Sequence, residues 1–182
     1  DFSLQYVWAY SNIELDTFYK VASFWGGQKG SLLFWTLLLT TYTTVVHFQN
    51  RKKNLRVVPY AMAVLLTIII FFLFLVNFST NPFERIPLPP EDGRGLNPLL
   101  QNYWMVIHPP TLYLGYVGFT VPFAFAVAAL ISKNLDDGWI RLTRKWTLIS
   151  WFFLCMGNLF GASWAYVELG WGGYWAWDPV EN

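Results

Sequence analysis

The sequence predicts an all-α integral membrane protein, a polytopic helical bundle with about four transmembrane helices in this chain. Apolar residues make up 55% of its 182 positions and charged residues only 13%, whereas soluble domains carry about 25% charge. The charged residues also leave four gaps, at 30–50, 57–83, 95–132 and 146–167. Each gap can hold the roughly 20 apolar residues that cross a bilayer as a helix. Four buried helices of a soluble core would leave too little polar surface in a chain of this length.

The first half of the chain contains two of the predicted helices. Residues 1–30 are rich in aromatic side chains and mixed in polarity, so we expect an interfacial loop there. The first helix is predicted at about 31–48 and the second at about 58–78. A compact loop with four Lys and Arg residues, 51–56, separates them.

The second half begins with a long connection. Residues 79–109 contain six of the ten prolines and charges of both signs, which predicts an ordered loop rather than a helix. The third helix is expected at about 110–132 and the fourth at about 146–166. A loop with four basic residues, 133–145, joins them. Residues 167–182 should form an aromatic loop and the start of a truncated helix.

The distribution of charge predicts how the chain is oriented in the membrane. The two short basic loops are expected on the cytoplasmic side, because cationic loops stay inside. The N-terminal loop 1–30, the loop 79–109 within the four-helix membrane segment 31–166, and the segment 167–182 then face outward. Since an even number of helices separates them, His108 and the C-terminal aromatic segment should share one side.

Several classes of protein are excluded by composition. The net charge is +1 and the basic residues sit in short loops, which does not indicate a nucleic-acid partner. Cys155 is the only cysteine, so no internal disulfide can form, and the absence of Cys-x-x-Cys-His means that the chain is not itself a c-type cytochrome. The chain starts without Met or a signal-peptide layout and ends just after a helix-start signal, so we expect it to be part of a longer protein.

Small residues predict close helix contacts inside the membrane. Gly157 and Gly161 form a Gly-x-x-x-Gly pair on one face of the fourth helix, and Gly115 and Gly118 thin one side of the third. Glycines allow helix backbones to approach closely where no hydrophobic force drives association. We interpret these four positions as packing surfaces rather than as cofactor contacts.

The C-terminal segment is the first of two candidate ligand sites. Four large aromatic residues fall within seven positions, beside two glycines that permit tight turns and close approach of a ligand: Trp171, Gly172, Gly173, Tyr174, Trp175 and Trp177. Asp178, Pro179 and Glu181 then fit the N-cap, first and third positions of a new helix, and we interpret both acids as cap residues. The aromatic cluster fits either an interfacial belt or a platform for a flat aromatic ligand such as a porphyrin.

His108 is the second candidate site. Pro109 follows it, and a residue before proline is pushed toward an extended conformation, so His108 is expected to project from the outer mouth of the third helix. An interfacial histidine can be a partly solvated polar residue, or its neutral imidazole can be an axial ligand of haem iron. Both interpretations stay open. His47, at the inner end of the first helix, is expected to be structural.

Three separated motifs resemble one family over nearly the whole chain. The segment Trp171–Asn182 resembles the WWD signature of haem-handling proteins of cytochrome c maturation, and its Asp-Pro-Val-Glu-Asn ending is similar to the CcmF/NrfE branch. The stretches Trp25–Leu32 and Ile107–Gly118 also resemble that branch. Tyr174 stands where the family commonly has Trp, which replaces one flat side chain with another.

The resemblance implies a haem lyase subunit of a bacterial-type inner (cytoplasmic) membrane, multi-pass, with its active face outward. Such proteins hold b-type haem, as a substrate in transit, and help to join its vinyl groups to the Cys-x-x-Cys-His thiols of apocytochrome c. They work with a haem chaperone and other maturation subunits. The full-length protein is also expected to carry a structural b haem.

The resemblance also implies which residues contact the haem. The WWD loop, Trp171 to Asp178, cradles it, and His108 supplies one axial ligand to the iron. The second outward histidine and the ligands of the structural haem lie outside these residues, so the chain holds half a ligand set. No protein nucleophile or general base is nominated, because the bond-forming groups belong to the haem and to the thiols.

Two other functions remain as alternatives. A haem transporter or carrier of the CcmC type would present haem without ligation to a cytochrome. A membrane transporter subunit without a cofactor would normally show a polar residue within a helix that lines its pathway, and Asn158 is the one weak candidate.

Overall fold

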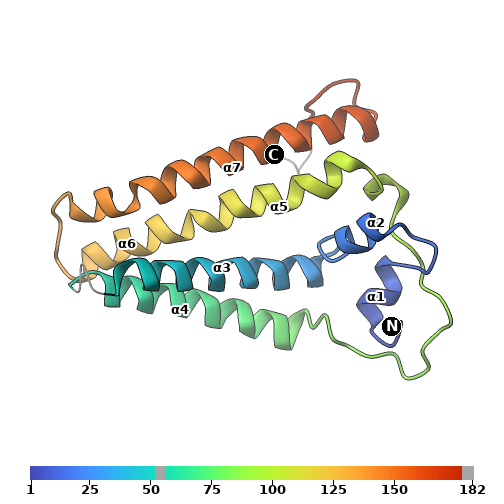
Figure 1. The fold of residues 1–182 in the computed structure, drawn as a ribbon, viewed down its shortest axis with the longest axis horizontal. Coiled ribbons are helices and arrows are strands. Elements are labelled where there is room, and N and C mark those ends of the chain that lie inside the picture. Colours follow the sequence, from blue (N-terminus) through green and yellow to red (C-terminus); the bar gives the residue numbers. More distant parts are fainter. Residues whose placement is uncertain (52–55, 178–182) are drawn as a thin grey trace.

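Residues 1–51 and 56–177 are described by a computed structural model of the chain, and their regular structure is helical apart from one isolated β-bridge between Leu4 and Arg85. Four helical rods run along the long axis (Figure 1). They are α3 (Gln28–Asn50), α4 (Val58–Phe74) with its π-helical extension η1 (Leu75–Ser79), α5 (Tyr103–Gly118) followed by α6 (Thr120–Ile131), and α7 (Gly138–Glu168). Within the described ranges, all four rods are long and apolar enough to cross a membrane, which confirms the predicted fold class.

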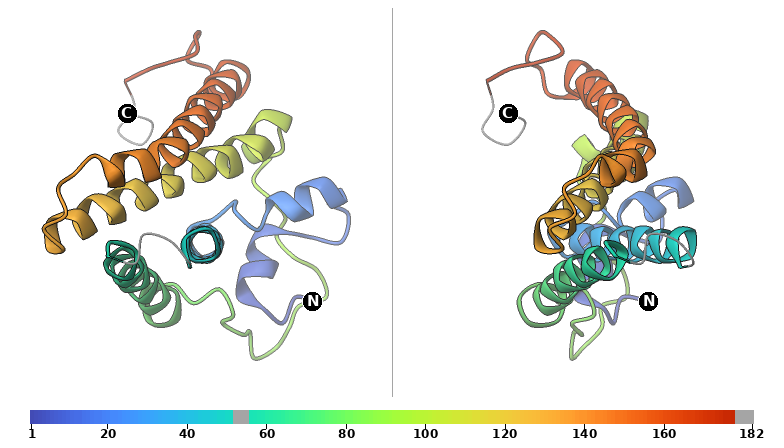
Figure 2. Two further views of the ribbon diagram at one scale, coloured as in Figure 1. Left: turned by 60° about the vertical axis from the view of Figure 1, so that its left-hand side comes forward. Right: turned by 90° about the vertical axis from the view of Figure 1, so that its left-hand side faces the viewer.

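The rods pack through one hydrophobic core and one seam of small residues. Side chains of α3, α4, α5 and α6 form the core, with Leu39, Leu65 and Phe125 almost fully buried in it. The seam joins α5 to α7, which lie side by side (Figures 1 and 2). A Cβ atom on Gly157 would lie 2.8 Å from the backbone of Leu112, so this glycine is needed for the close approach. The predicted packing role is confirmed for Gly157 and for Gly115, whose Cβ would clash with the Leu154 backbone nitrogen.

A small helical platform covers one end of the bundle, where a single interfacial loop was predicted. It contains α1 (Gln5–Tyr10), α2 (Thr17–Ala22) and the 3-10 turn η2 (Pro98–Leu100). The Tyr6 hydroxyl lies 3.0 Å from the carbonyl oxygen of Ser23 and accepts the N–H of Gly27 at 3.0 Å. Burial of this side chain raises the pKa of Tyr6 to about 12. Local turns and helix caps such as Asp16 therefore order the first 30 residues more than their mixed polarity indicated.

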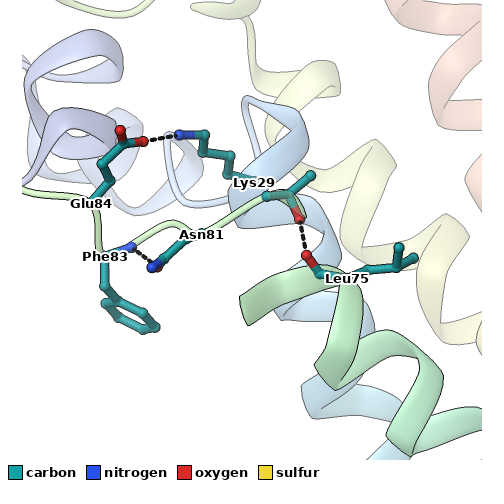
Figure 3. Close-up of polar contacts among 6 residues, drawn as sticks. Lys29, Leu75, Asn81, Phe83 and Glu84 are labelled. Atoms are coloured by element: carbon teal, nitrogen blue, oxygen red, sulfur yellow. Dashed lines mark hydrogen bonds and ion pairs between the residues drawn. The ribbon is translucent and has the colours of Figure 1, made fainter. Parts of the chain in front are cut away.

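The loop after η1 is fastened to this platform. Lys29 forms an ion pair with Glu84 at 2.7 Å, and the backbone N–H of Gln5 donates to the Glu84 carbonyl at 2.9 Å. Figure 3 shows this pair beside two local bonds of the same loop, from the Thr80 hydroxyl to the Leu75 carbonyl and from the Phe83 N–H to the Asn81 side chain. The loop is ordered, as predicted, and it ends at the start of α5.

The third rod begins at Tyr103, seven residues before the predicted start at Pro110. The Asn102 side chain accepts the N–H of Trp104 at 2.8 Å and caps the helix there. Pro109 lies within α5 and removes one backbone donor, and the Thr111 hydroxyl donates to the Ile107 carbonyl at 2.7 Å in the same turn. His108 is therefore helical, and the prediction that it is extended at the mouth of the helix was wrong.

The fourth rod is also longer than predicted, because it begins at Gly138 rather than near Trp146. Arg141, Arg144 and Lys145, which were expected in a loop, lie on its first turns. The predicted membrane span was limited by these charged residues. Charged residues do not end a helix, however, because Arg and Lys are good helix formers. At about 1.5 Å per residue α7 is about 46 Å long, so part of it extends beyond a hydrocarbon layer of about 30 Å.

Candidate functional site

His108 lies on α5 with its imidazole turned toward α7. Its Nδ1 atom is 2.8 Å from the carbonyl oxygen of Gly157. A carbonyl oxygen can only accept a hydrogen bond, so Nδ1 carries a proton, and in the neutral imidazole Nε2 then keeps its lone pair. A histidine that binds a metal is held in the same way, with its other nitrogen donating to a carbonyl or carboxylate.

Gly161 provides the space that the imidazole occupies. A Cβ atom at this position would lie 2.7 Å from Cε1 and 2.9 Å from Nδ1 of His108. On the same helix, the Trp164 ring is nearly parallel to the imidazole, at 21° and with 6.5 Å between the ring centroids. Gly157, Gly161 and Trp164 recur at helical spacing, so one face of α7 orients His108.

Two hydrogen bonds fasten the start of α5 to the end of α7 close to His108. The Asn102 amide donates to Glu168 Oε1 at 2.8 Å while its oxygen caps α5. The Trp164 indole N–H donates to the Leu99 carbonyl at 3.1 Å. These bonds join segments more than 60 positions apart and hold the mouth of the seam in one register.

The aromatic segment after α7 folds back along the end of that helix (Figure 1). Gly170 and Gly172 have φ angles of 65° and 74°, a left-handed conformation that favours glycine and allows the chain to reverse. Tyr174 then stacks on Tyr166 of α7, with ring centroids 4.5 Å apart and planes at 15°. The glycines thus act in the turn that returns the aromatic side chains to α7.

A pocket of about 570 Å³ lies between these parts. Pockets for small organic ligands usually measure about 300–1,000 Å³. Side chains of α5, α7 and the aromatic segment line it: His108, Cys155, Asn158, Leu159, Gly161, Ala162, Ala165, Trp171, Tyr174 and Trp175. The predicted meeting of His108 with the aromatic segment at one end of the bundle is therefore observed.

The structure brings together only part of the predicted site. Trp171, Tyr174 and Trp175 line the pocket, whereas Gly172 and Gly173 do not. Trp177 is 87% exposed and packs edge-on against Trp175 at 4.8 Å. Asp178 was also predicted to contact the ligand, and it lies outside the described residues.

The metal-binding side chains of the pocket are too few for a bare metal ion, but they can supply one axial ligand to a metal that is already held in a larger molecule. Among residues 1–51 and 56–177, no group of three or more His, Cys, Asp or Glu side chains could hold a bare metal ion. The pocket instead combines one imidazole, the thiol of Cys155 and the amide of Asn158 with flat aromatic rings and small apolar residues. This arrangement suits a porphyrin better than a free cation. His47 is far from it, at the C-terminal end of α3 beside Phe48.

Several residues of the site were not identified from the sequence. Trp164 and Asn102 contribute through contacts across more than 60 positions, and no local pattern marks such contacts. Gly161 was assigned to helix packing, although its closest neighbour is the imidazole itself. Gly161 is four positions from Gly157, so the sequence already placed the two glycines on one face of the helix. This spacing was the signal in the sequence that could have linked Gly161 to the site.

Comparison with known protein families supports the resemblance. The family described as "Cytochrome C assembly protein" matches residues 25–182, and the chain belongs to this family. The family resemblance drawn from three motifs is thereby confirmed.

The curated relatives are longer than this chain. It is 48% identical to the cytochrome c-type biogenesis protein CcmF of Escherichia coli, with all of this chain and 28% of the relative covered. It is 48% identical to NrfE of Haemophilus influenzae and 47% identical to CycK of Rhizobium meliloti, covering 29% and 27% of them. The chain thus spans less than a third of the length of these relatives. No solved structure matches it significantly.

Proposed function

We propose that this chain forms the haem-holding part of a cytochrome c maturation protein, in which His108 is an axial ligand of the haem iron. The observation that carries the proposal is the orientation of one imidazole. The Nδ1–H of His108 donates to the Gly157 carbonyl, which leaves Nε2 as the ring nitrogen that can bind iron. His108 lines a pocket together with three aromatic side chains. The relatives are named cytochrome c-type biogenesis proteins, which supports this class of function.

The aromatic segment would hold the flat ligand against α7. Trp171, Tyr174 and Trp175 present ring surfaces to the pocket, and ring faces stack well on a porphyrin. The small side chains of Ala162 and Ala165 also line the pocket and leave room for a large planar molecule. The protein's part is to bind and orient haem rather than to supply a reacting group.

The finer activity that we propose is that of a haem lyase subunit. In that reaction each cysteine S–H of apocytochrome c adds across a vinyl double bond of haem, so a C–S and a C–H bond form and nothing leaves. The chain's own residues orient the haem for this addition. A second axial ligand, a haem chaperone and other maturation subunits would complete the assembly.

We further propose that the pocket faces outward from a bacterial-type inner membrane. Figure 1 shows the end of α3, the start of α4 and the end of α6 together, at the end of the bundle opposite the C-terminal end of α7. Arg51, Arg56 and Lys133 stand next to these three helix ends in the sequence, and basic segments stay on the cytoplasmic side. The pocket end carries the ion pair of Lys29 with Glu84 and has no comparable excess of cations in the described ranges.

The test is His108→Ala in the full-length protein, with His47→Ala as the matched control at the other end of the bundle. We expect His108→Ala to remain membrane-inserted, to lose the haem absorbance of the purified protein, and to abolish covalent haem attachment in an assembly assay. Added imidazole should partly restore the absorbance. Wild-type yields of holocytochrome in His108→Ala would contradict the proposal.

The same measurements separate the alternatives. A wild-type protein that binds haem but attaches none to apocytochrome c would support the carrier function. A wild-type protein without any haem absorbance would support a transporter subunit without a cofactor.

A further inference from the structure

The end of the bundle opposite the proposed haem pocket presents a concentrated excess of positive charge. We call it the basic end and define it by six described side chains: Arg51, Arg56, Lys133, Arg141, Arg144 and Lys145. All six are exposed, and Asp136 and Asp137 are the acids in these segments. Among the described residues, the ion pair of the molecule is Lys29 with Glu84 at the other end, and none joins the basic end.

Three of these cations project from one face of α7. Arg141, Arg144 and Lys145 are spaced by three and four positions, which places them side by side on a helix. Because α7 is about 46 Å long, its first turns can stand outside the hydrocarbon and reach the headgroup layer. Long basic side chains at this depth extend toward the headgroups.

The backbone at Lys133 holds one cation of the basic end in a fixed turn after α6. Lys133 has φ at 53°, the left-handed conformation that follows many helices and is usually taken by glycine. The N–H of Asn134 donates to the Ala129 carbonyl at 3.0 Å, so this is a regular helix-ending turn after α6. A lysine in this conformation costs about 1 kcal/mol relative to glycine, and its cation lies at the C-terminal end of α6, where the helix dipole favours positive charge.

A shallow hollow joins the two loops of the basic end. It measures about 240 Å³ and is lined by Arg56 and Val57 on one side and by Asn134 and Trp139 on the other, with Asp136, Gly138 and Leu142. The Asp136 carboxylate is engaged with the N–H of Gly138 at 2.9 Å, so it helps to start α7. An indole beside a guanidinium at headgroup depth suits a molecule with an anionic head and an apolar tail.

We propose that the basic end binds the headgroup of an anionic phospholipid of the surrounding leaflet. The phosphate would interact with Arg56, which lines the hollow, and with the cations on the first turns of α7, which lie outside the hollow lining. The acyl chains would lie against the exposed apolar side chains of α7, such as Leu148 and Ile149. This interaction lies at the opposite end of the bundle from the haem pocket and does not depend on haem.

The experiment measures the preference for an anionic lipid over a neutral one. The full-length protein is placed in mixed micelles with spin-labelled phosphatidylglycerol or with spin-labelled phosphatidylcholine of identical acyl chains, and the immobilised fraction is compared at low and high salt. We expect phosphatidylglycerol to be preferred, and the preference to fall at high salt. The triple variant R141Q/R144Q/K145Q should weaken the preference, by about fivefold for each cation removed.

Two further variants separate charge from folding. Arg85→Gln removes an exposed cation at the haem end and should leave the lipid preference unchanged. Lys133→Gly should raise the thermal midpoint, because it relieves the left-handed backbone, and yet weaken the lipid preference about fivefold. A purely structural role of Lys133 would move only the thermal midpoint, which would count against the proposal.

Three results would overturn the inference. The wild-type protein could bind both lipids equally, or the triple variant could keep the full preference while folded. Inorganic phosphate could also displace phosphatidylglycerol at concentrations similar to those of the lipid, which would identify a site for free phosphate instead.

Discussion

Gly161→Ala gives a direct test of how the proposed haem pocket is built, because it adds one methyl group at the point where α7 touches the imidazole. The new Cβ would lie 2.7 Å from His108 Cε1, whereas ordinary contacts of Cβ atoms begin at 3.4 Å. The ring or the helix must therefore move by about 0.7 Å. Functional groups need to be placed within about 0.5 Å, so the position of Nε2 would be lost.

The expected energies follow from the same contact. Overpacking usually costs about 1–3 kcal/mol, and weakening the 2.8 Å bond from His108 to the Gly157 carbonyl costs about 0.5–1.5 kcal/mol. Replacing glycine by alanine inside a helix returns about 1 kcal/mol. These terms give a net destabilisation of about 0.5–3.5 kcal/mol. Because Gly161 orients the proposed axial ligand, we expect a haem affinity reduced about 10- to 100-fold.

The assay is a titration of the purified full-length variant with haem, followed by absorbance, together with thermal unfolding. The matched control is Ser163→Ala, two positions along α7, whose hydroxyl donates to the Leu159 carbonyl and does not line the pocket. The control should bind haem like the wild type. A folded Gly161→Ala protein with wild-type haem affinity and an unshifted absorbance band would refute the idea that this glycine positions His108.

Two further predictions concern the platform and the mouth of the seam. Burial raises the pKa of Tyr6 to about 12 from about 10 in the unfolded chain, so its contribution to stability is complete below pH 10 and is lost as the pH rises toward 12. The thermal midpoint should fall across that interval, and Tyr6→Phe should remove this part of the fall; an identical profile in the variant would disprove the assignment. Asn102→Ala removes both the cap on Trp104 and the bond to Glu168, so we expect a loss of about 1–3 kcal/mol in unfolding experiments. Asn97→Ala, which removes a cap on a short 3-10 turn only, should cost less, and equal losses would argue against the link to α7.

The sequence predicted the number and order of the membrane helices because charge is absent from each span. It predicted their ends less well. The prolines at 109 and 110 and the basic residues at 141–145 indicated boundaries, and both lie inside helices. In each case a cap set by neighbouring residues, Asn102 before α5 and the turn at Asp136 before α7, decided where the helix begins.

The site was predictable in its main residues and not in its supporting ones. Parity of the spans brought His108 to the same end as the tryptophan segment, and the pocket contains both. The contacts of Trp164 with Leu99 and of Asn102 with Glu168 depend on the register between two helices. That register comes from side-chain packing along the whole seam, which single-sequence patterns do not contain.

The acceptor for His108 is a main-chain oxygen, and this has a consequence for how the protein can diverge. Every residue has a main-chain carbonyl, so substitutions of the side chains around the imidazole do not remove the acceptor at position 157. The ring therefore keeps the same tautomer when its neighbours change. Covariation between position 108 and any single partner should therefore be weak. The constraint would be recorded instead as an intolerance of side chains at 161, where a Cβ atom would meet the imidazole, and at 157, where it would meet Leu112 of α5.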